Sequence, residues 1–285
     1  MNFFKPVCCT LTFWMIFNIL TSSHLWPFAI HHSWAEETKE KQSTDHRTQS
    51  ADQAYMQRES EAKARKALSI YRRLHTERER HPDYAWKTAM ASYYVGLHHP
   101  KNEKEAEMLF EKGEEAAREG FLFNEDCAPC YFWAAVNNLL WGQKGGSLRL
   151  LFVIRTAQKN LEKVNQLDET VAYAGGWRTL GQIEVGLPGF FGGSDERAER
   201  YFKKAIEIVP EKPINYLYLT RLYLEQMDQP EKALEVANKA VRLPPPPEHD
   251  VENRHALRDL QKILKKKLSN VTLSKKENLP FSVQQ

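Results

Sequence analysis

The chain has 285 residues, of which 42% are hydrophobic. This is enough for one or two globular domains, and the composition excludes a disordered or collagen-like chain. A formal net charge of +3 is too small to indicate nucleic-acid binding, so no nucleic-acid partner is expected. Four cysteines are too few for a disulfide-dense scaffold.

The first 35 residues have the pattern of an export signal. A short positive start ends at Lys5, an uncharged and mostly apolar stretch follows at residues 6–20, and Ser33 and Ala35 precede two glutamates. We therefore expect a signal peptide at residues 1–35 and a folded part that is exported, periplasmic or envelope-associated. The alternative is an uncleaved anchor, although these 15 residues fall short of the ~20 that span a bilayer.

Two segments outside the body are polar. Residues 36–55 hold almost no large aliphatic side chains, and residues 269–285 are similar. Such a composition cannot bury a core, which predicts a linker at the first position and a flexible tail at the second. The folded domain is therefore expected at residues 56–268.

The body has helical periodicity and repeats itself. The clearest repeating set is Ala198, Phe202, Ala205 and Pro210. The same separations of 4, 3 and 5 residues return 35 residues later from Ala233, and weaker copies begin at Ala106 and Ala157. Self-similarity at such a period is typical of stacked helical repeats.

This spacing has a physical reason in a pair of packed helices. Small residues such as Ala198 and Ala205 let the second helix approach the first, Phe202 fills the space between pairs, and Pro210 ends the helix. One pair cannot bury its own apolar face, so pairs stack. The predicted fold class is all-α, a right-handed superhelix of stacked helix pairs (an α-solenoid), with a C-terminal capping helix at about residues 250–268.

The third and fourth units resemble a known repeat. Trp177, Leu180 and Gly181, followed by the set that begins at Ala198, are similar to a tetratricopeptide repeat. In the first units the alanines are 51 and 41 residues apart, more than the repeat's length of about 34. The extra length is predicted in inter-helix loops, which are expected at residues 98–103, 143–147 and 187–194.

Four stretches of the sequence point to one family among the repeat proteins, at residues 130–138, 161–169, 175–183 and 187–210. Together they resemble the T-components of TRAP transporters, the TatT-like family of exported tetratricopeptide-repeat proteins. This resemblance implies a non-enzymatic transport accessory that docks a periplasmic solute-binding protein, holds a small hydrophobic or amphipathic ligand, and forms a homo-oligomer. Many T-components are lipoproteins, whereas no lipidation box precedes Cys8 or Cys9 here. Microtubule-dynamics regulator proteins share a similar helix pattern and match less well.

The sequence contains no catalytic or cofactor motif. It has no nucleophile elbow, His-Glu-x-x-His zinc motif, phosphate loop or dinucleotide-binding glycine pattern. We therefore predict no enzyme activity, no catalytic residues, no cofactor and no metal site. The alternative to the transport accessory is a general envelope adaptor that binds peptide segments in the groove of the repeats.

Cys127 and Cys130 are the cysteines that remain once the signal is removed. No second cysteine pair and no following histidine support a zinc or haem site. In an oxidising compartment the two residues would close a small disulfide. A reduced structural pair and a redox or metal role are the other two interpretations.

Repeats of this kind resemble one another in binding through the inner face of each first helix. Counting from the leading aromatics at 86, 133, 177 and 216, the predicted ligand or partner groove comprises Tyr84, Lys87, Tyr94, Tyr131, Asn138, Trp141, Arg178, Gln182, Leu217 and Arg221. An apolar groove with a few cations suits a small amphipathic anion or a peptide terminus. The alternative is that these side chains pack inside the superhelix.

Phe190 and Phe191 stand together in a loop rich in glycine and proline. Adjacent aromatic residues at such a position either fill the core or form a loop interface. The sequence leaves both interpretations open.

Overall fold

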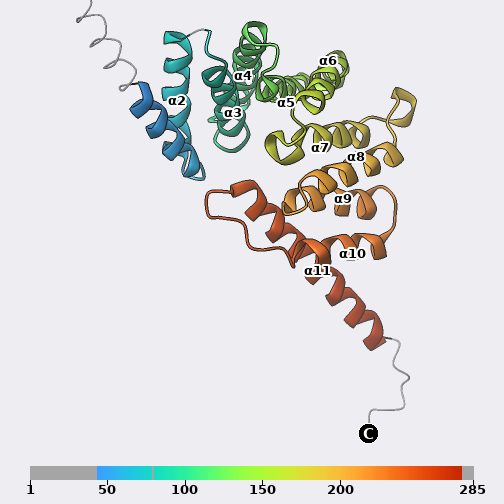
Figure 1. Cartoon of the computed structure of the whole chain (residues 1–285). Helices are drawn as coiled ribbons and strands as arrows, with labels where there is room; N and C mark the ends of the chain where they lie inside the picture. Colours follow the sequence, from blue (N-terminus) through green and yellow to red (C-terminus); the bar gives the residue numbers. More distant parts are fainter. Residues whose placement is uncertain (1–43, 79, 278–285) are drawn as a thin grey trace, which may run out of the picture. The chain divides into compact units, whose positions relative to one another are not determined.

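The computed structural model describes residues 44–78 and 80–277 (Figure 1). The expected signal peptide lies outside these residues. Within the described ranges the regular structure is helical and no strand occurs. The described residues all belong to one compact unit.

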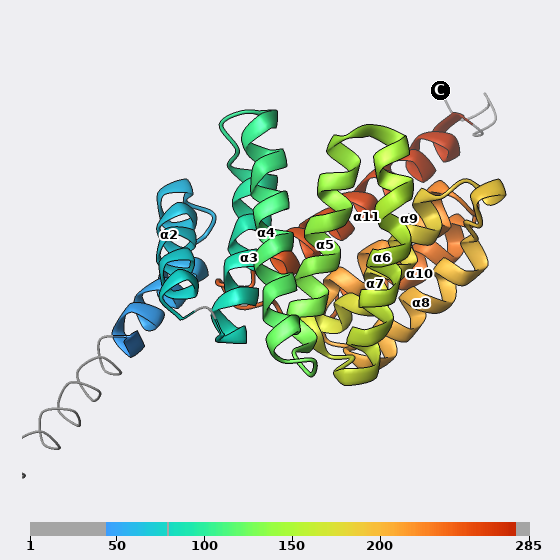
Figure 2. The same cartoon turned by 90° about the horizontal axis from the view of Figure 1, so that it is seen from above.

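A helix at residues 44–56 comes first. The elements that follow are α2 (Glu61–Glu77), α3 (Pro82–His98), α4 (Glu103–Phe123), α5 (Ala128–Lys144), α6 (Gly146–Leu167), α7 (Val171–Gly186), a 3₁₀ turn (Gly189–Phe191), α8 (Asp195–Ile208), α9 (Pro213–Glu225), α10 (Pro230–Ala240) and α11 (Val251–Glu277). Consecutive helices pack as pairs, and neighbouring pairs stack side by side (Figure 2). The predicted α-solenoid of stacked helix pairs is confirmed.

The first pair is the part of the fold that the sequence interpretation missed. Residues 36–55 were predicted to form a linker, but residues 44–56 are helical and pair with α2. Ala51 and Ala54 are buried in a cluster with Ala67 and Tyr71. The linker prediction is therefore wrong from Thr44 onward, because two alanines on one face let helices pack closely without any large aliphatic residue.

The extra length of the early repeats lies in helices and not in loops. α4 has 21 residues and α6 has 22, against 14 in α8 and 11 in α10. A single residue, Gly145, joins α5 to α6, so the predicted loop at 143–147 is wrong, and only residues 99–102 join α3 to α4. A pair can lengthen in this way because its buried positions recur along α4 from Ala106 to Gly120. The predicted loop at 187–194 is present.

Aromatic residues of the second helices fit against glycines of the first helices. A Cβ atom on Gly96 would lie 2.7 Å from the Phe110 ring, and one on Gly181 would lie 2.5 Å from the Phe202 ring. Such separations leave no room for any side chain, so glycine is required for this close approach. The same notch occurs in the α3–α4 and α7–α8 pairs, which explains why the spacing of the repeat recurs within this chain.

The C-terminal helix caps the last pair. Ala256 and Leu260 of α11 are buried against α9 and α10, in one cluster with Leu217 and Ala237. The helix extends to Glu277, beyond the predicted end of the cap, because no proline or glycine interrupts residues 251–277. The prediction of a flexible tail from residue 269 is therefore wrong as far as Glu277.

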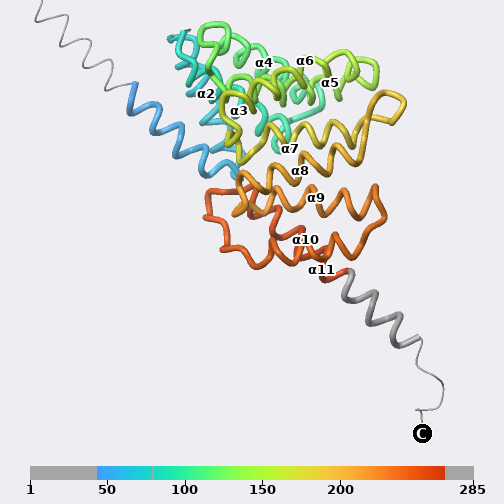
Figure 3. The backbone as a smooth tube through the Cα atoms, turned by 45° about the vertical axis from the view of Figure 1, so that its right-hand side comes forward, coloured from blue at the N-terminus to red at the C-terminus, as the bar shows by residue number. Residues whose placement is uncertain are grey.

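The turn after the first helix meets the start of α11 (Figure 3). The buried guanidinium of Arg58 forms an ion pair with Glu252, and it also donates to the backbone oxygen of His249 across 3.2 Å. Glu59 accepts from Arg254 and lies 3.1 Å from His255. Residues almost 200 positions apart in the sequence thus share one polar contact.

Candidate functional site

The predicted groove residues of α3 are covered by the first helix. Lys87 forms an ion pair with Asp52, with 2.7 Å between Nζ and Oδ1. Thr48 donates a hydrogen bond to the Tyr84 hydroxyl across 3.3 Å. Both contacts are to residues 44–56, which were expected to be a linker, so Tyr84 and Lys87 pack between helices and do not line an open groove.

Tyr94 is buried beside the contact with α11. The Arg58 guanidinium lies 5.2 Å from its ring centroid, and the ring of His98 lies 4.4 Å away. Burial raises the pKa of Tyr94 to about 12, so its hydroxyl stays protonated even in moderately alkaline solution. Tyr94 therefore belongs to the polar closure between the first pair and the capping helix.

The remaining predicted groove residues are distributed over several contacts. Leu217 is buried against α11, and Arg221 pairs with Asp259 of the same helix across 3.1 Å. Tyr131 stacks on Phe121 with 4.3 Å between ring centroids, while the guanidinium of Arg149 lies 4.3 Å from the Trp141 ring. Asn138 is half-buried on α5, and Gln182 is half-buried on α7. The structure does not bring the ten residues together in one site.

Arg178 is the most buried charge among the predicted groove residues, at 7% exposure. Its Nη1 atom donates to the Tyr173 oxygen across 2.8 Å and to Asn215 Oδ1 across 2.7 Å, and its Nη2 atom donates to the Ala172 oxygen across 3.0 Å. Burial lowers the pKa of the Arg178 guanidinium. No carboxylate forms an ion pair with it among the described residues, so its direct hydrogen-bond partners are neutral oxygens.

The carbonyls that Arg178 holds belong to a left-handed turn at the start of α7. Ala172, Tyr173 and Ala174 have φ angles of 51°, 61° and 58°. Left-handed conformations cost L-residues roughly 1–2 kcal/mol each. The guanidinium therefore has a structural role, since it stabilises a backbone conformation that these residues avoid.

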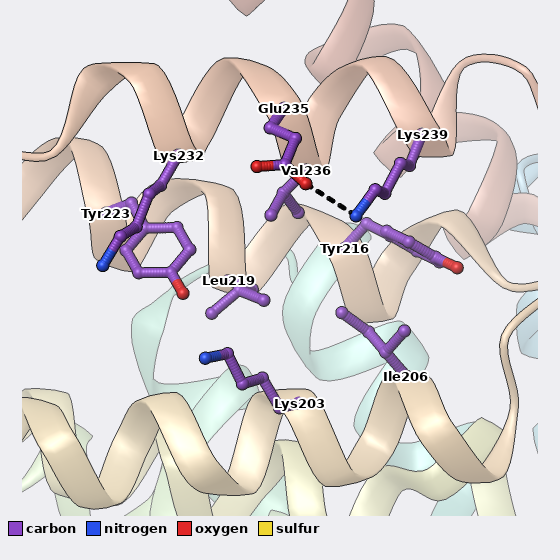
Figure 4. A pocket seen from close by; sticks show the side chains of 9 residues that line it. All are labelled: Lys203, Ile206, Tyr216, Leu219, Tyr223, Lys232, Glu235, Val236 and Lys239. Atoms are coloured by element: carbon purple, nitrogen blue, oxygen red, sulfur yellow. Dashed lines mark hydrogen bonds and ion pairs between the residues drawn. The ribbon is translucent and has the colours of Figure 1, made fainter.

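A pocket of about 380 Å³ lies between α8, α9 and α10 (Figure 4). Its lining consists of apolar side chains, tyrosines, three lysines and one glutamate: Lys203, Ile206, Tyr216, Leu219, Tyr223, Lys232, Glu235, Val236 and Lys239. A volume in this range accommodates a small ligand or a few side chains of a peptide. The pocket is therefore the candidate functional site.

Two of the three lysines form ion pairs with glutamates. Lys203 lies 2.7 Å from Glu199 and Lys239 lies 2.8 Å from Glu235. These hydrogen bonds raise the pKa of Lys203 and lower the pKa of Glu235. Lys203 and Glu235 are therefore charged at neutral pH.

Lys232 differs from the other two lysines. It lies over the Tyr223 ring, with 5.6 Å between Nζ and the ring centroid, and has no ion pair within the part of the chain that the structure describes. Figure 4 shows its side chain alongside that ring. The pocket thus combines an apolar floor with one ammonium group that is available to an anion.

No lining residue of this pocket was among the predicted site residues. The prediction followed the inner face of the first helices, whereas the pocket is built from the second helices α8 and α10 with α9 between them. A sequence signal was present, because Tyr216, Leu219 and Tyr223 repeat at helical spacing and two lysines follow in α10.

Phe190 and Phe191 lie on the surface and do not fill the core. Their side chains are 84% and 53% exposed, and their ring centroids are 4.4 Å apart. Of the two interpretations of this loop, the structure favours the exposed one.

Cys127 and Cys130 are joined by a disulfide at the start of α5. Among the described residues, no group of histidine, cysteine or acidic side chains is able to hold a metal ion. Within those same ranges, no helix is both long and apolar enough to cross a membrane.

Comparison with known proteins places the chain in the class of tetratricopeptide-like α-solenoids. The crystal structure of TTC0263, a thermophilic TPR protein of Thermus thermophilus, is 17% identical and covers 76% of this chain and 98% of its own, with a TM-score of 0.59. Two crystal structures of MamA, 15% and 16% identical, cover 70% and 65% of this chain and 91% of their own. Their TM-scores of 0.44 and 0.43 are too low to carry an argument.

A family model described as regulator of microtubule dynamics protein 1-3 matches residues 48–147, about a third of the chain. This family is the one to which the sequence showed the weaker resemblance. No curated protein matches the chain. The similarity to the TatT-like family remains a prediction.

Proposed function

We propose that this protein is a non-enzymatic scaffold that binds a short acidic segment of a partner protein in the pocket between α8, α9 and α10. The observation that carries the proposal is the combination of three lysine side chains with an apolar floor in one pocket of about 380 Å³.

The floor explains how such a segment would be anchored. Ile206, Leu219 and Val236 line the pocket between the helices, so one aliphatic or aromatic side chain of the segment would displace water from them. The volume limits the anchor to a few side chains. A segment longer than this continues over the surface of α10.

The lysines explain why the segment is expected to be acidic. A carboxylate beside the anchor would pair with Lys232, which needs no rearrangement because no glutamate holds it within the described residues. Lys203 and Lys239 would also contact the segment, by releasing Glu199 and Glu235 and pairing with its carboxylates instead. Rim charges of this kind select the sign of the partner and speed its association.

The partner follows from the predicted location. If the folded part is exported, the scaffold acts in the periplasm or at the envelope, and a general adaptor for peptide segments fits the pocket best. A solute-binding protein, as in the TatT-like T-components, is the more specific partner within this proposal. A bound amphipathic ligand and a homo-oligomer belong to that specific version.

A second candidate rests on the family match at residues 48–147, whose description names regulators of microtubule dynamics. It predicts that the full chain sediments with polymerised tubulin. The pocket lies outside the matched residues, so this binding is expected to survive charge reversal at Lys232. Retention of all protein in the supernatant would remove this candidate.

The test of the pocket begins with a photo-crosslinker in place of Glu235, on the full chain in its own cells. A crosslinker in place of Lys66 on α2, an exposed residue far from the pocket in the sequence, serves as the control position. Mass spectrometry then identifies the segment that is captured from Glu235 and not from Lys66. A synthetic peptide of that segment is titrated against the purified full chain.

Lys232→Glu is expected to weaken peptide binding about tenfold, which corresponds to about 1.4 kcal/mol. Lys66→Glu, an exposed lysine on α2, is the matched control and should leave the affinity unchanged. A captured segment without acidic residues, or an equal affinity in both variants, would contradict the proposal.

A further inference from the structure

Four large apolar side chains are exposed at two neighbouring tips of the solenoid. Leu148 and Phe152, in the first turns of α6, are 75% and 82% exposed, and the loop between α7 and α8 presents Phe190 and Phe191. Figures 1 and 3 both place the α5–α6 turn and this loop on the same edge of the stacked pairs. Exposed apolar groups of this size mark an interaction surface.

Basic residues stand directly behind the apolar tip of α6. Leu148, Phe152, Arg155 and Lys159 follow one another at helical spacing and are all exposed. Arg155 and Lys159 form no ion pair within the described part of the chain. By contrast, Lys144 and Arg149 are occupied by glutamates of α4.

We infer that this edge docks on the surface of an anionic lipid bilayer. Leu148, Phe152, Phe190 and Phe191 would enter the boundary between headgroups and acyl chains, and Arg155 and Lys159 would contact lipid phosphates. These six residues form the docking edge.

The spacing along α6 agrees with the layers of a bilayer. At a rise of 1.5 Å per residue, Arg155 lies about 4.5 Å above Phe152 along the helix axis and Lys159 lies about 10 Å above it. Interfacial helices bury their apolar groups about 5–10 Å into the boundary. Cations at these heights therefore coincide with the phosphate layer.

Charge and chain organisation favour a bilayer over a protein partner. Apart from Arg149, which pairs with Glu107, α6 has three basic residues and one acidic residue, so its exposed side complements anionic lipids. The apolar groups stand at separate tips, which suits insertion between lipids. The same chain also has the uncharged apolar stretch at residues 6–20, which would hold the protein at a membrane wherever it is retained.

The test uses the full chain, vesicles of phosphatidylcholine with or without phosphatidylglycerol, and hydrogen exchange read by mass spectrometry. Because residues 6–20 can attach the chain to any vesicle, total binding is uninformative and the local protection is the readout. Peptides covering residues 145–152 and 187–193 are expected to gain protection on the anionic vesicles and not on the neutral ones.

Phe152→Ser combined with Phe190→Ser should return both peptides to their exchange rates in lipid-free buffer. Leu122→Ser combined with Phe123→Ser is the matched control, since these exposed residues end α4 on the opposite edge (Figure 2). The control should keep the protection. Thermal melting of each variant shows that the fold is intact.

Replacing Arg155 or Lys159 with Gln should raise the concentration of anionic lipid needed for half-maximal protection about fivefold for each charge removed. The reason is that each basic residue near an anionic surface increases the membrane affinity by about that factor. Equal exchange with and without vesicles would overturn the inference. Protection that rises with protein concentration in the absence of lipid would also overturn it, and would assign the docking edge to a contact between protein copies.

Discussion

Arg178 donates a hydrogen bond to Asn215 across 2.7 Å, and this contact connects two repeats. The Asn215 side chain is fully buried, and its Nδ2 atom donates to the backbone oxygens of Ala205 and Val209, each across 3.1 Å. One guanidinium and one amide thus join α7, the end of α8 and α9. The left-handed turn belongs to α7, and α8 and α9 line the pocket.

Removing the guanidinium is predicted to destabilise the protein strongly. Arg178→Ala leaves the oxygens of Ala172, Tyr173 and Asn215 without their donor, and hydrogen bonds to charged groups contribute about 1.5–3 kcal/mol each. We expect the free energy of unfolding to fall by about 3 kcal/mol, measured by urea denaturation.

Arg221→Ala is the control for this variant. Arg221 stands in the next repeat and forms a half-exposed pair with Asp259, which should contribute less than about 1 kcal/mol. Equal losses in the two variants would show that Arg178 does not hold the turn.

A glycine at position 228 is predicted to stabilise the loop between α9 and α10. Asp228 is exposed and has a φ angle of 47°, a conformation that favours glycine. Asp228→Gly should raise the free energy of unfolding by about 0.5 kcal/mol, because the relief of strain exceeds the extra chain entropy.

The opposite sign is expected for an ordinary helical position. Ala62→Gly, at an exposed site of α2, should lower stability by roughly 0.5–1 kcal/mol. Differential scanning calorimetry of both variants gives the comparison, and a loss of stability in Asp228→Gly would contradict the assigned backbone conformation.

Acid should weaken the contact between α2 and α4 over a defined range of pH. Arg65 holds both carboxylate oxygens of Glu105 at 3.0 and 3.1 Å, and this hydrogen bonding lowers the pKa of Glu105 to about 2 from 4.5. A lowered folded-state pKa contributes stability above pH 4.5 that is lost as the pH falls to about 2.

Glu105→Gln should therefore cost about 1 kcal/mol at neutral pH, after allowance for solvent screening. The variant should also lose less stability than the native protein between pH 4.5 and pH 2. Urea denaturation at a series of pH values measures both effects, and parallel curves for the two proteins would refute the role of Glu105.

The contact between Arg58 and Glu252 is predicted to hold the first pair against the capping helix. Arg58→Glu should lower the free energy of unfolding by about 3 kcal/mol, because it leaves Glu252 facing a like charge in a half-buried site. It should also increase hydrogen exchange in residues 44–60 and at the start of α11.

The exchanged pair Arg58→Glu with Glu252→Arg should recover part of this loss, since opposite charges face each other again. A double variant as unstable as the sum of its single variants would show that the two residues do not interact.

The arrangement of the repeats followed from local signals. Ala198, Phe202 and Ala205 define a helix face within two turns, and Gly181 leaves the notch into which Phe202 packs. Such spacing involves residues that are close together in the sequence, so one sequence is enough to predict the helix pairs. The linker prediction was wrong at Thr44 because composition alone does not reveal that Ala51 and Ala54 pack against α2.

The residues that pack against the predicted groove could not be predicted from such local spacing. The inner-face rule selected Lys87 and Arg178 correctly as first-helix residues, but their partners Asp52 and Asn215 lie 35 and 37 residues away. Whether a helix face is open or covered depends on those distant partners.

The sequence by itself therefore determined the class of fold, the pairing of helices and the positions where helices approach closely, because helical periodicity and side-chain size act over a few residues. The tertiary structure decided which faces remain accessible. It brought Lys203 and Lys232 to one pocket, placed Phe152 and Phe190 on one edge, and buried Arg178, because stacking the pairs determines which surfaces are exposed to solvent.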